Sequence, residues 1–155
     1  MLKDTINKID RGKNPLGHDL SIAFGTLGGQ NSPHFYMRVV PKYKKDYGNV
    51  AYHYTYYKQA TPEQIELTKR TLKPNSDNVI AEKSKVIAKL NNETAFGYTV
   101  ISTKNHLPND INAVDQEIWD QIGEIFHEIM RKMEEGIDCH GFTIRCYLGE
   151  NCAKA

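Results

Sequence analysis

Hydrophobic residues recur at helical spacing in three segments of the chain. The clearest segment is 113–135, where apolar residues follow one another every three or four positions and a glycine at the end supplies a stop. A second helix is predicted over 61–74, because Thr61 and Gln64 form a capping box just before its apolar positions. A short amphipathic helix over residues 2–9 is expected to open the chain.

Short segments rich in β-branched and aromatic residues separate these helices, and each is typical of a strand. They are Leu20–Phe24, His34–Val40, Val50–Tyr57, Val79–Glu82, Val86–Leu90, Tyr98–Ser102 and Phe142–Tyr147. The segments at 79–82 and 86–90 are close enough in the chain to form a hairpin. Short strands interrupted by helices predict an α+β fold with a mostly antiparallel sheet.

The composition narrows the class of protein. A chain of 155 residues suits one domain, and 39% hydrophobic with 25% charged residues is the balance of a globular protein with a core. A net charge of +1 argues against recruitment to nucleic acid by bulk charge, and no apolar run is long enough for a bilayer. The sequence has no secretory signal and only three cysteines, all near the end of the chain, so we expect reduced thiols and a cytoplasmic protein. We expect neither a metal nor a cofactor.

One stretch, from the glycines at 28 and 29 to residue 43, carries most of the candidate chemistry. If 34–40 is a strand, His34, Tyr36 and Arg38 point to one face and the intervening apolar residues are buried on the other. The preceding glycine turn offers backbone N–H groups to a phosphate, and Gln30 adds an amide. An anion-binding strand and an ordinary solvent-exposed strand face both remain open from these residues alone.

The same stretch resembles the signature of the histidine-triad superfamily, GGQ followed by P-H-φ-H-φ-H-φφ-P-[RK]-Y, where φ is apolar. Residues 97–106 resemble the strand of that family that begins with glycine and ends in K-x-H. Residues 47–72 are similar to the segment that follows the signature in the galactose-1-phosphate uridylyltransferase-like branch. The resemblance covers most of the chain.

The family's two halves occur here in rotated order. Residues 1–78 resemble its back half and residues 79–155 its front half, so the resemblance implies a single domain over 1–155 with a circularly permuted, antiparallel sheet and one long helix packed on it. An H-x-[LF]-[ST]-I pattern occurs at both 18–22 and 140–144, as expected if each half keeps a copy of the join. The resemblance also implies a homodimer. Permutation within one chain and exchange of halves between two chains both stay open.

The resemblance assigns roles to individual residues. The catalytic positions of the triad correspond here to His34, Tyr36 and Arg38. The phosphate-binding and ribose-binding positions correspond to Gln30, Ser32 and Gly29, and to Asn91 or Asn92. In the family the middle histidine attacks the α-phosphate and forms a covalent nucleotidyl intermediate. Here that position is a tyrosine, which is almost wholly protonated at neutral pH, and the third position is an arginine, which cannot act as a base.

Three functions follow from these residues. The first is a protein that binds nucleotides, nucleotide sugars or other phosphate esters and has lost nucleotidyl transfer. The second is an active nucleotidyltransferase or nucleotide phosphoester hydrolase that uses a substituted nucleophile. The third is a structural or regulatory subunit without a small-molecule site. We expect the first, with no nucleic acid or membrane among the partners.

Overall fold

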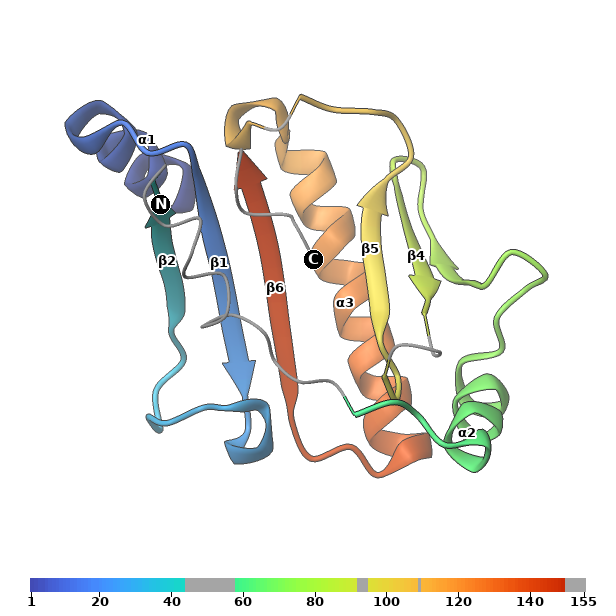
Figure 1. Cartoon of the computed structure of the whole chain (residues 1–155). Helices are drawn as coiled ribbons and strands as arrows, with labels where there is room; N and C mark the ends of the chain where they lie inside the picture. The colour runs from blue at the N-terminus through green and yellow to red at the C-terminus, as the bar shows by residue number, and fades with distance from the viewer. Residues whose placement is uncertain (44–57, 92–94, 109, 150–155) are drawn as a thin grey trace. The chain divides into compact units, whose positions relative to one another are not determined.

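Two compact units make up the part of the chain that the computed structural model describes (Figure 1). The described residues are 1–43, 58–91, 95–108 and 110–149. The first unit comprises Met1–Tyr54, Pro108–Ala113 and His140–Ala155, and the second comprises Thr55–Leu107 and Val114–Cys139. The predicted α+β class with antiparallel strands is confirmed. The described strands pair as two three-stranded sheets, one in each unit, rather than in one sheet.

The sheet of the first unit is built around β1 (Gly17–Phe24). Strands β2 (Met37–Lys42) and β6 (Phe142–Gly149) pair with it in antiparallel register, one on each side (Figure 1). Successive residues of β1 face opposite sides of the sheet, so Leu20 lies on an apolar face and Ser21 on a polar one. The strand begins at Gly17 rather than at the predicted Leu20.

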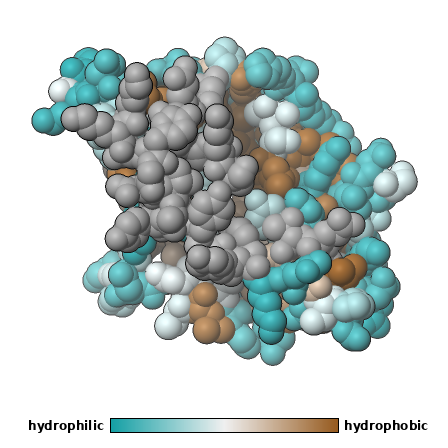
Figure 2. All heavy atoms as spheres, in the orientation of Figure 1, coloured by the Kyte–Doolittle hydropathy of each residue, from teal (hydrophilic) through white to brown (hydrophobic). Residues whose placement is uncertain are grey.

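Helix α1 (Leu2–Lys13) opens the first unit and is longer than the segment predicted from its apolar residues. Its single buried residue is Ile6, which is 1% exposed. The visible side of this helix is mostly hydrophilic (Figure 2). Asn14 ends the helix in the left-handed conformation, in which its N–H donates to the carbonyl of Asp10.

A glycine turn after β1 packs directly against the backbone that enters β6. The turn contains the short 3₁₀ helix η1 (Thr26–Gly28), and a Cβ on Gly28 would lie only 2.7 Å from the backbone nitrogen of Phe142. A Cβ on Gly141 would likewise lie 2.5 Å from the nitrogen of Gly28. The hydroxyl of Thr143 donates to the carbonyl of Gly28 at 2.8 Å. These glycines therefore permit a backbone approach that any side chain would prevent.

The second unit contains the predicted hairpin, with the predicted bounds. Strands β3 (Val79–Glu82) and β4 (Val86–Leu90) are antiparallel, and β4 also pairs with β5 (Thr99–Thr103). Val86 and Ala88 of the central strand are fully buried. Along β4, buried residues alternate with the partly exposed Ile87 and the exposed Lys89, which is the pattern of a sheet covered on one face.

Helix α2 (Pro62–Leu72) begins as its sequence predicts. The backbone N–H of Gln64 donates to the hydroxyl of Thr61 at 3.2 Å, and the backbone N–H of Thr61 donates to the side-chain oxygen of Gln64 at 3.0 Å. This reciprocal pair satisfies two of the donors that a helix leaves open at its start. The predicted capping box is thus confirmed.

Helix α3 (Gln116–Ile137) contacts α2, β3 and β4 in the same unit. Asp115 caps its start, after a separate 3₁₀ turn, η3 (Ile111–Ala113), that replaces the beginning of the predicted helix. The helix also continues through the glycine that was expected to end it. Its buried residues are Ile118, Ile125, Ile129 and Met133. Because packing within the chain buries this apolar face, the predicted homodimer has no support from it and stays a prediction.

The turn of the β3–β4 hairpin is held to the start of α3 by charged and amide side chains. The ammonium of Lys85 lies 2.6 Å from Glu117 and 3.1 Å from Asp115. The side chain of Gln121 accepts from the backbone N–H of Lys85 at 2.8 Å and donates to the hydroxyl of Ser84 at 2.7 Å. Hydrogen bonds to Glu117 and then to Asp115 raise the pKa of Lys85.

Replacing Lys85 with glutamine is expected to lower the melting temperature at low ionic strength. The loss should shrink in about 1 M salt, because the screening length falls to about 3 Å. Since the pKa of Lys85 is raised on folding, its contribution is fully present below about pH 10.4, the unfolded value, and disappears as the pH rises through the folded value. Lys89→Gln, on the adjoining strand β4, is the control. Equal, salt-independent losses in both variants would contradict this role.

Some predictions concern features that the described residues do not test. The strand expected over Val50–Tyr57 lies outside them. The single-domain assignment, the permuted order and the exchange of halves stay predictions. Within the described part of the chain, we find no helix with both the length and the apolar character needed to cross a bilayer.

Candidate functional site

The glycine turn uses its own backbone donors. The N–H groups of Gly28 and Gln30 donate to the carbonyl of Gly25, at 3.0 and 3.1 Å, and the N–H of Gly29 donates to that of Thr26 at 3.0 Å. Gly29 has a φ of 88°, which favours glycine for conformational reasons. The donors that the sequence offered to a phosphate are therefore directed into the turn, and an anion at this site would be held by side chains instead.

Gln30 closes the loop that follows the turn. Its side-chain oxygen accepts from the N–H of Gly25 at 2.9 Å, and its side-chain nitrogen donates to the carbonyl of Ser32 at 2.8 Å. The amide thereby fixes the path of the chain between β1 and β2. Ser32 in turn accepts from the backbone N–H of His34 through its hydroxyl at 3.3 Å. Gln30 and Ser32, two of the three residues predicted to bind phosphate, thus make hydrogen bonds within the loop, and their contact with phosphate stays a prediction.

Tyr36 lies at the centre of a small polar cluster. Its hydroxyl donates to the side-chain oxygen of Asn31 at 2.7 Å and accepts from the guanidinium of Arg38 at 3.2 Å. The backbone N–H of Asn31 also donates to the hydroxyl oxygen of Tyr36, at 3.4 Å. Arg38 also lies over the tyrosine ring, with its Cζ 5.3 Å from the ring centroid. The phenolic proton is directed at an amide rather than at a base, which is unfavourable for a nucleophile.

Strand β2 begins at Met37, so the predicted alternation over residues 34–40 is wrong for its first half. His34 and Tyr36 lie in the loop before the strand, and Phe35 is 67% exposed instead of buried. The ladder between β1 and β2 ends at the pair of Ile22 and Met37, and before it the hydroxyl of Tyr36 hydrogen-bonds back to Asn31 within the loop. The ring of Phe35 lies 5.9 Å from that of Phe24, at the end of β1.

Of the three residues predicted as catalytic, Arg38 lies within a strand, β2, and its position is therefore set by the strand pairing. It lies directly opposite Ser21 of β1, and Arg145 of β6 lies opposite Ser21 on the other side. Directly opposed residues of antiparallel strands share a face, so the two arginines flank Ser21 on the polar face. Asp19 shares this face and is buried. Neither Asn31 nor Arg145 was singled out from the sequence, because their roles depend on a hydrogen bond within the loop and on strand register.

Of the two residues predicted to bind ribose, Asn91 is described and belongs to the second unit. Asn91 follows β4 in the second unit, and its backbone N–H donates to the carbonyl of Tyr98 at 2.7 Å. Asn92 lies outside the described residues.

Other groups offer little alternative chemistry. Burial, with a smaller contribution from Asp19, raises the pKa of the Cys146 thiol, which keeps it protonated and unreactive at neutral pH. The side chains of His34, His106 and His127 are exposed. In the described ranges there is no group of three histidine, cysteine or carboxylate side chains arranged to hold a metal ion.

Comparisons were made with protein-family models, with curated proteins and with solved structures. None of the three found a significant match to this chain.

Proposed function

We propose that this protein binds phosphate esters of the nucleotide or nucleotide-sugar type through Arg38 and its neighbours, and that it does not carry out nucleotidyl transfer. The observation that carries the proposal is the placement of Arg38. Its guanidinium is exposed, yet it is oriented by the hydroxyl and the ring of Tyr36. An arginine held in one geometry loses less freedom when it forms paired hydrogen bonds to phosphate oxygens.

The charge around Arg38 favours an anionic ligand. The chain has no aspartate or glutamate from residue 20 to residue 45, a range that includes one arginine and three lysines. Arg145 adds a second guanidinium to the same sheet face, to which the buried Asp19 contributes one carboxylate. Two guanidinium groups against one carboxylate leave a local excess of positive charge, which attracts anions and raises their association rate. The imidazole of His34, exposed in the preceding loop, is available as a further donor.

The resemblance to the histidine-triad superfamily supports a nucleotide rather than a bare phosphate as the ligand. Its phosphate-binding signature corresponds to the segment that carries Arg38, and its ribose-binding position corresponds to Asn91 or Asn92. A homodimer and the rotated order of halves belong to the same proposal. Loss of transfer is supported by Tyr36, whose proton is donated to Asn31 and whose described partners, Asn31 and Arg38, cannot act as a general base.

The proposal is tested by thermal stability in a panel of nucleoside mono-, di- and triphosphates, nucleotide sugars and dinucleoside polyphosphates. A ligand at about 100 times its dissociation constant stabilises the folded state by roughly 2.7 kcal/mol. We expect a selective stabilisation that Arg38→Ala weakens by at least about tenfold in affinity, which is about 1.4 kcal/mol. Arg70→Ala, an exposed arginine on α2, is the matched control and should leave the affinity unchanged.

The remaining outcomes favour the other two functions. A flat panel, or affinity that survives Arg38→Ala, would contradict binding at this site and favour a structural or regulatory subunit. Turnover of a bound nucleotide, abolished by His34→Ala or by Tyr36→Phe, would contradict the loss of transfer and favour an active enzyme.

A further inference from the structure

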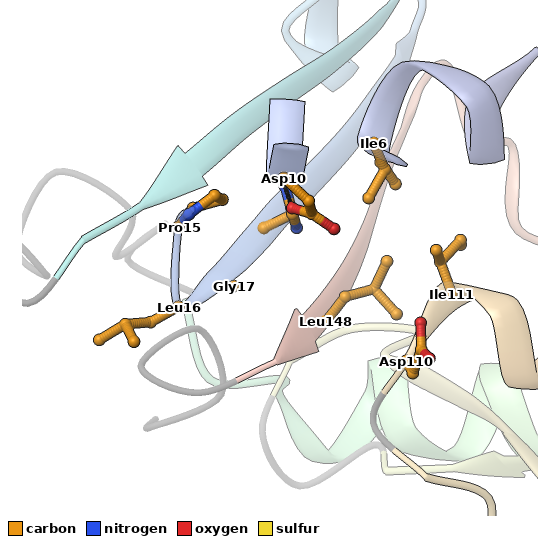
Figure 3. A pocket seen from close by; sticks show the side chains of 9 residues that line it. Ile6, Asp10, Pro15, Leu16, Gly17, Asp110, Ile111 and Leu148 are labelled. Atoms are coloured by element: carbon orange, nitrogen blue, oxygen red, sulfur yellow. Dashed lines mark ion pairs between the residues drawn. The ribbon is translucent and has the colours of Figure 1, made fainter. Parts of the chain in front are cut away.

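The first unit contains a small cavity that is separate from the Arg38 cluster. It lies between α1, the start of β1, the residues around η3 and the end of β6 (Figure 3). Its volume is about 120 Å³. The lining combines three ionisable side chains, Asp10, His18 and Asp110, with aliphatic ones.

Two polar atoms on the wall of this cavity are buried without a hydrogen bond. They are the Nε2 of His18 and the Oδ1 of Asp10, which lie 3.2 Å apart. His18 as a whole is only 5% exposed. The two atoms form an ion pair only when the His18 ring is protonated, and the side chain of Asp10 as a whole is 45% exposed. A buried acceptor that makes no hydrogen bond costs stability, so the pair with a neutral ring is unfavourable unless a donor reaches it. If Nε2 carries no proton, both atoms are acceptors, and their shared partner must be a donor from outside the pair.

Asp110 supplies a further carboxylate on another wall of the cavity. Its Oδ1 accepts from the backbone N–H and the side-chain amide of Asn112, at 3.0 and 3.1 Å, which orients the carboxylate. Asn112 also exchanges two side-chain hydrogen bonds with Asn7 of α1, both at 3.2 Å. This amide pair holds the helix to the turn that carries Asp110. In Figure 3 the carboxylates of Asp10 and Asp110 both point toward the space between the aliphatic side chains.

The rest of the lining limits the size and the polarity of an occupant. Ile6 and Ile111 are almost fully buried, and Leu148 completes an aliphatic surface beside the carboxylates (Figure 3). A cavity of this volume holds only a few non-hydrogen atoms. A fully hydrated inorganic cation would leave the aliphatic surface unused, whereas a short alkyl chain would cover it.

We propose that this cavity binds a small primary amine in its ammonium form, with a short aliphatic body. An ammonium group has three donors and no acceptor, which matches three acceptors on the wall: Asp10 Oδ1, His18 Nε2 and the carboxylate of Asp110. Its positive charge compensates the two carboxylates, and its alkyl part packs on Ile6, Ile111 and Leu148. The site is independent of phosphate binding at Arg38.

The experiment titrates the full chain with isobutylamine and, as a neutral probe of equal shape, with isobutanol. Binding is followed by calorimetry and by the ¹⁵N resonances of the His18 ring. We expect isobutylamine to bind with a dissociation constant of about 1 mM, as suits so small a ligand, and to shift the Nε2 resonance. Isobutanol should do neither. Asp10→Asn and Asp110→Asn should each weaken the amine at least about tenfold.

Asp4→Asn is the matched control, because Asp4 lies on the same helix, pairs with the chain's amino group and does not line the cavity. It should leave the amine affinity unchanged. Circular dichroism of each variant establishes that it is folded. Absence of amine binding to the wild-type chain, equal binding of isobutanol, or equal losses in Asp4→Asn would each overturn the proposal. A His18 ring with both nitrogens protonated and unresponsive to the amine would also overturn it.

Discussion

Gly28→Ala is expected to destabilise the first unit by about 3 kcal/mol or more, which is the upper part of the range for overpacking. The new Cβ would lie 2.7 Å from the backbone nitrogen of Phe142 and closer still to its carbonyl oxygen. Both neighbours are backbone atoms, so no side-chain rotation relieves the contact. The turn and the start of β6 would have to separate, and the hydrogen bond from Thr143 to Gly28 would be lost with them.

The measurement is urea unfolding followed by circular dichroism, with Gly12→Ala as the control. Gly12 lies in α1 and has no atom within 4 Å of its ideal Cβ position, so alanine should be neutral or stabilising there by up to about 1 kcal/mol. A Gly28→Ala variant as stable as the wild type would contradict the close backbone packing.

Two glycines of α3 are expected to respond to alanine with opposite signs. Gly123 has open space around its Cβ position, so Gly123→Ala should stabilise the chain by about 0.5–1 kcal/mol through helix propensity. A Cβ on Gly136 would meet the side chain of Thr71 on α2, including its hydroxyl oxygen at 2.9 Å. Gly136→Ala should therefore lose about 1–3 kcal/mol from overpacking between the two helices.

A double variant makes this prediction specific to the contact. Thr71→Ala removes the hydroxyl and the methyl group that a Cβ on Gly136 would meet, so it should recover part of the stability lost in Gly136→Ala. The free energies of unfolding of the two single variants and the double variant give the coupling. Stabilisation by both Gly123→Ala and Gly136→Ala, or the absence of coupling to Thr71, would contradict the packing of α2 on α3.

Local signals account for what could be predicted of the fold. The start of α2 depends on Thr61 and Gln64, which are three positions apart, and the β3–β4 hairpin depends on two β-branched runs separated by a short turn. These interactions lie within a few residues, so sequence patterns record them. The grouping of strands into two sheets depends on pairing between β1 and β6, which are more than a hundred residues apart, and no local pattern encodes it.

The candidate site was only partly predictable, because it depends on side-chain contacts in and around irregular loops, which no repeating pattern encodes. Residue types favoured Arg38 as an anion-binding group, and the structure orients it through Tyr36. The alternation of residues could not reveal that Tyr36 hydrogen-bonds back to Asn31 or that Phe35 lies outside the strand. The position of His18 before a strand gave no sign that it would be buried beside Asp10.

The proposed function is tested most directly by titrating ¹⁵N-labelled protein with ADP, which carries the diphosphate common to nucleoside diphosphates and nucleotide sugars. Saturable shifts are expected in the backbone amides of residues 31–38 and in the Nε of Arg38, and Arg38→Ala should abolish them while Arg70→Ala keeps them. The resonances of Ile6 and His18 should not respond, because the amine cavity is separate. Shifts confined to other parts of the chain, or none at millimolar ADP, would contradict phosphate-ester binding at Arg38.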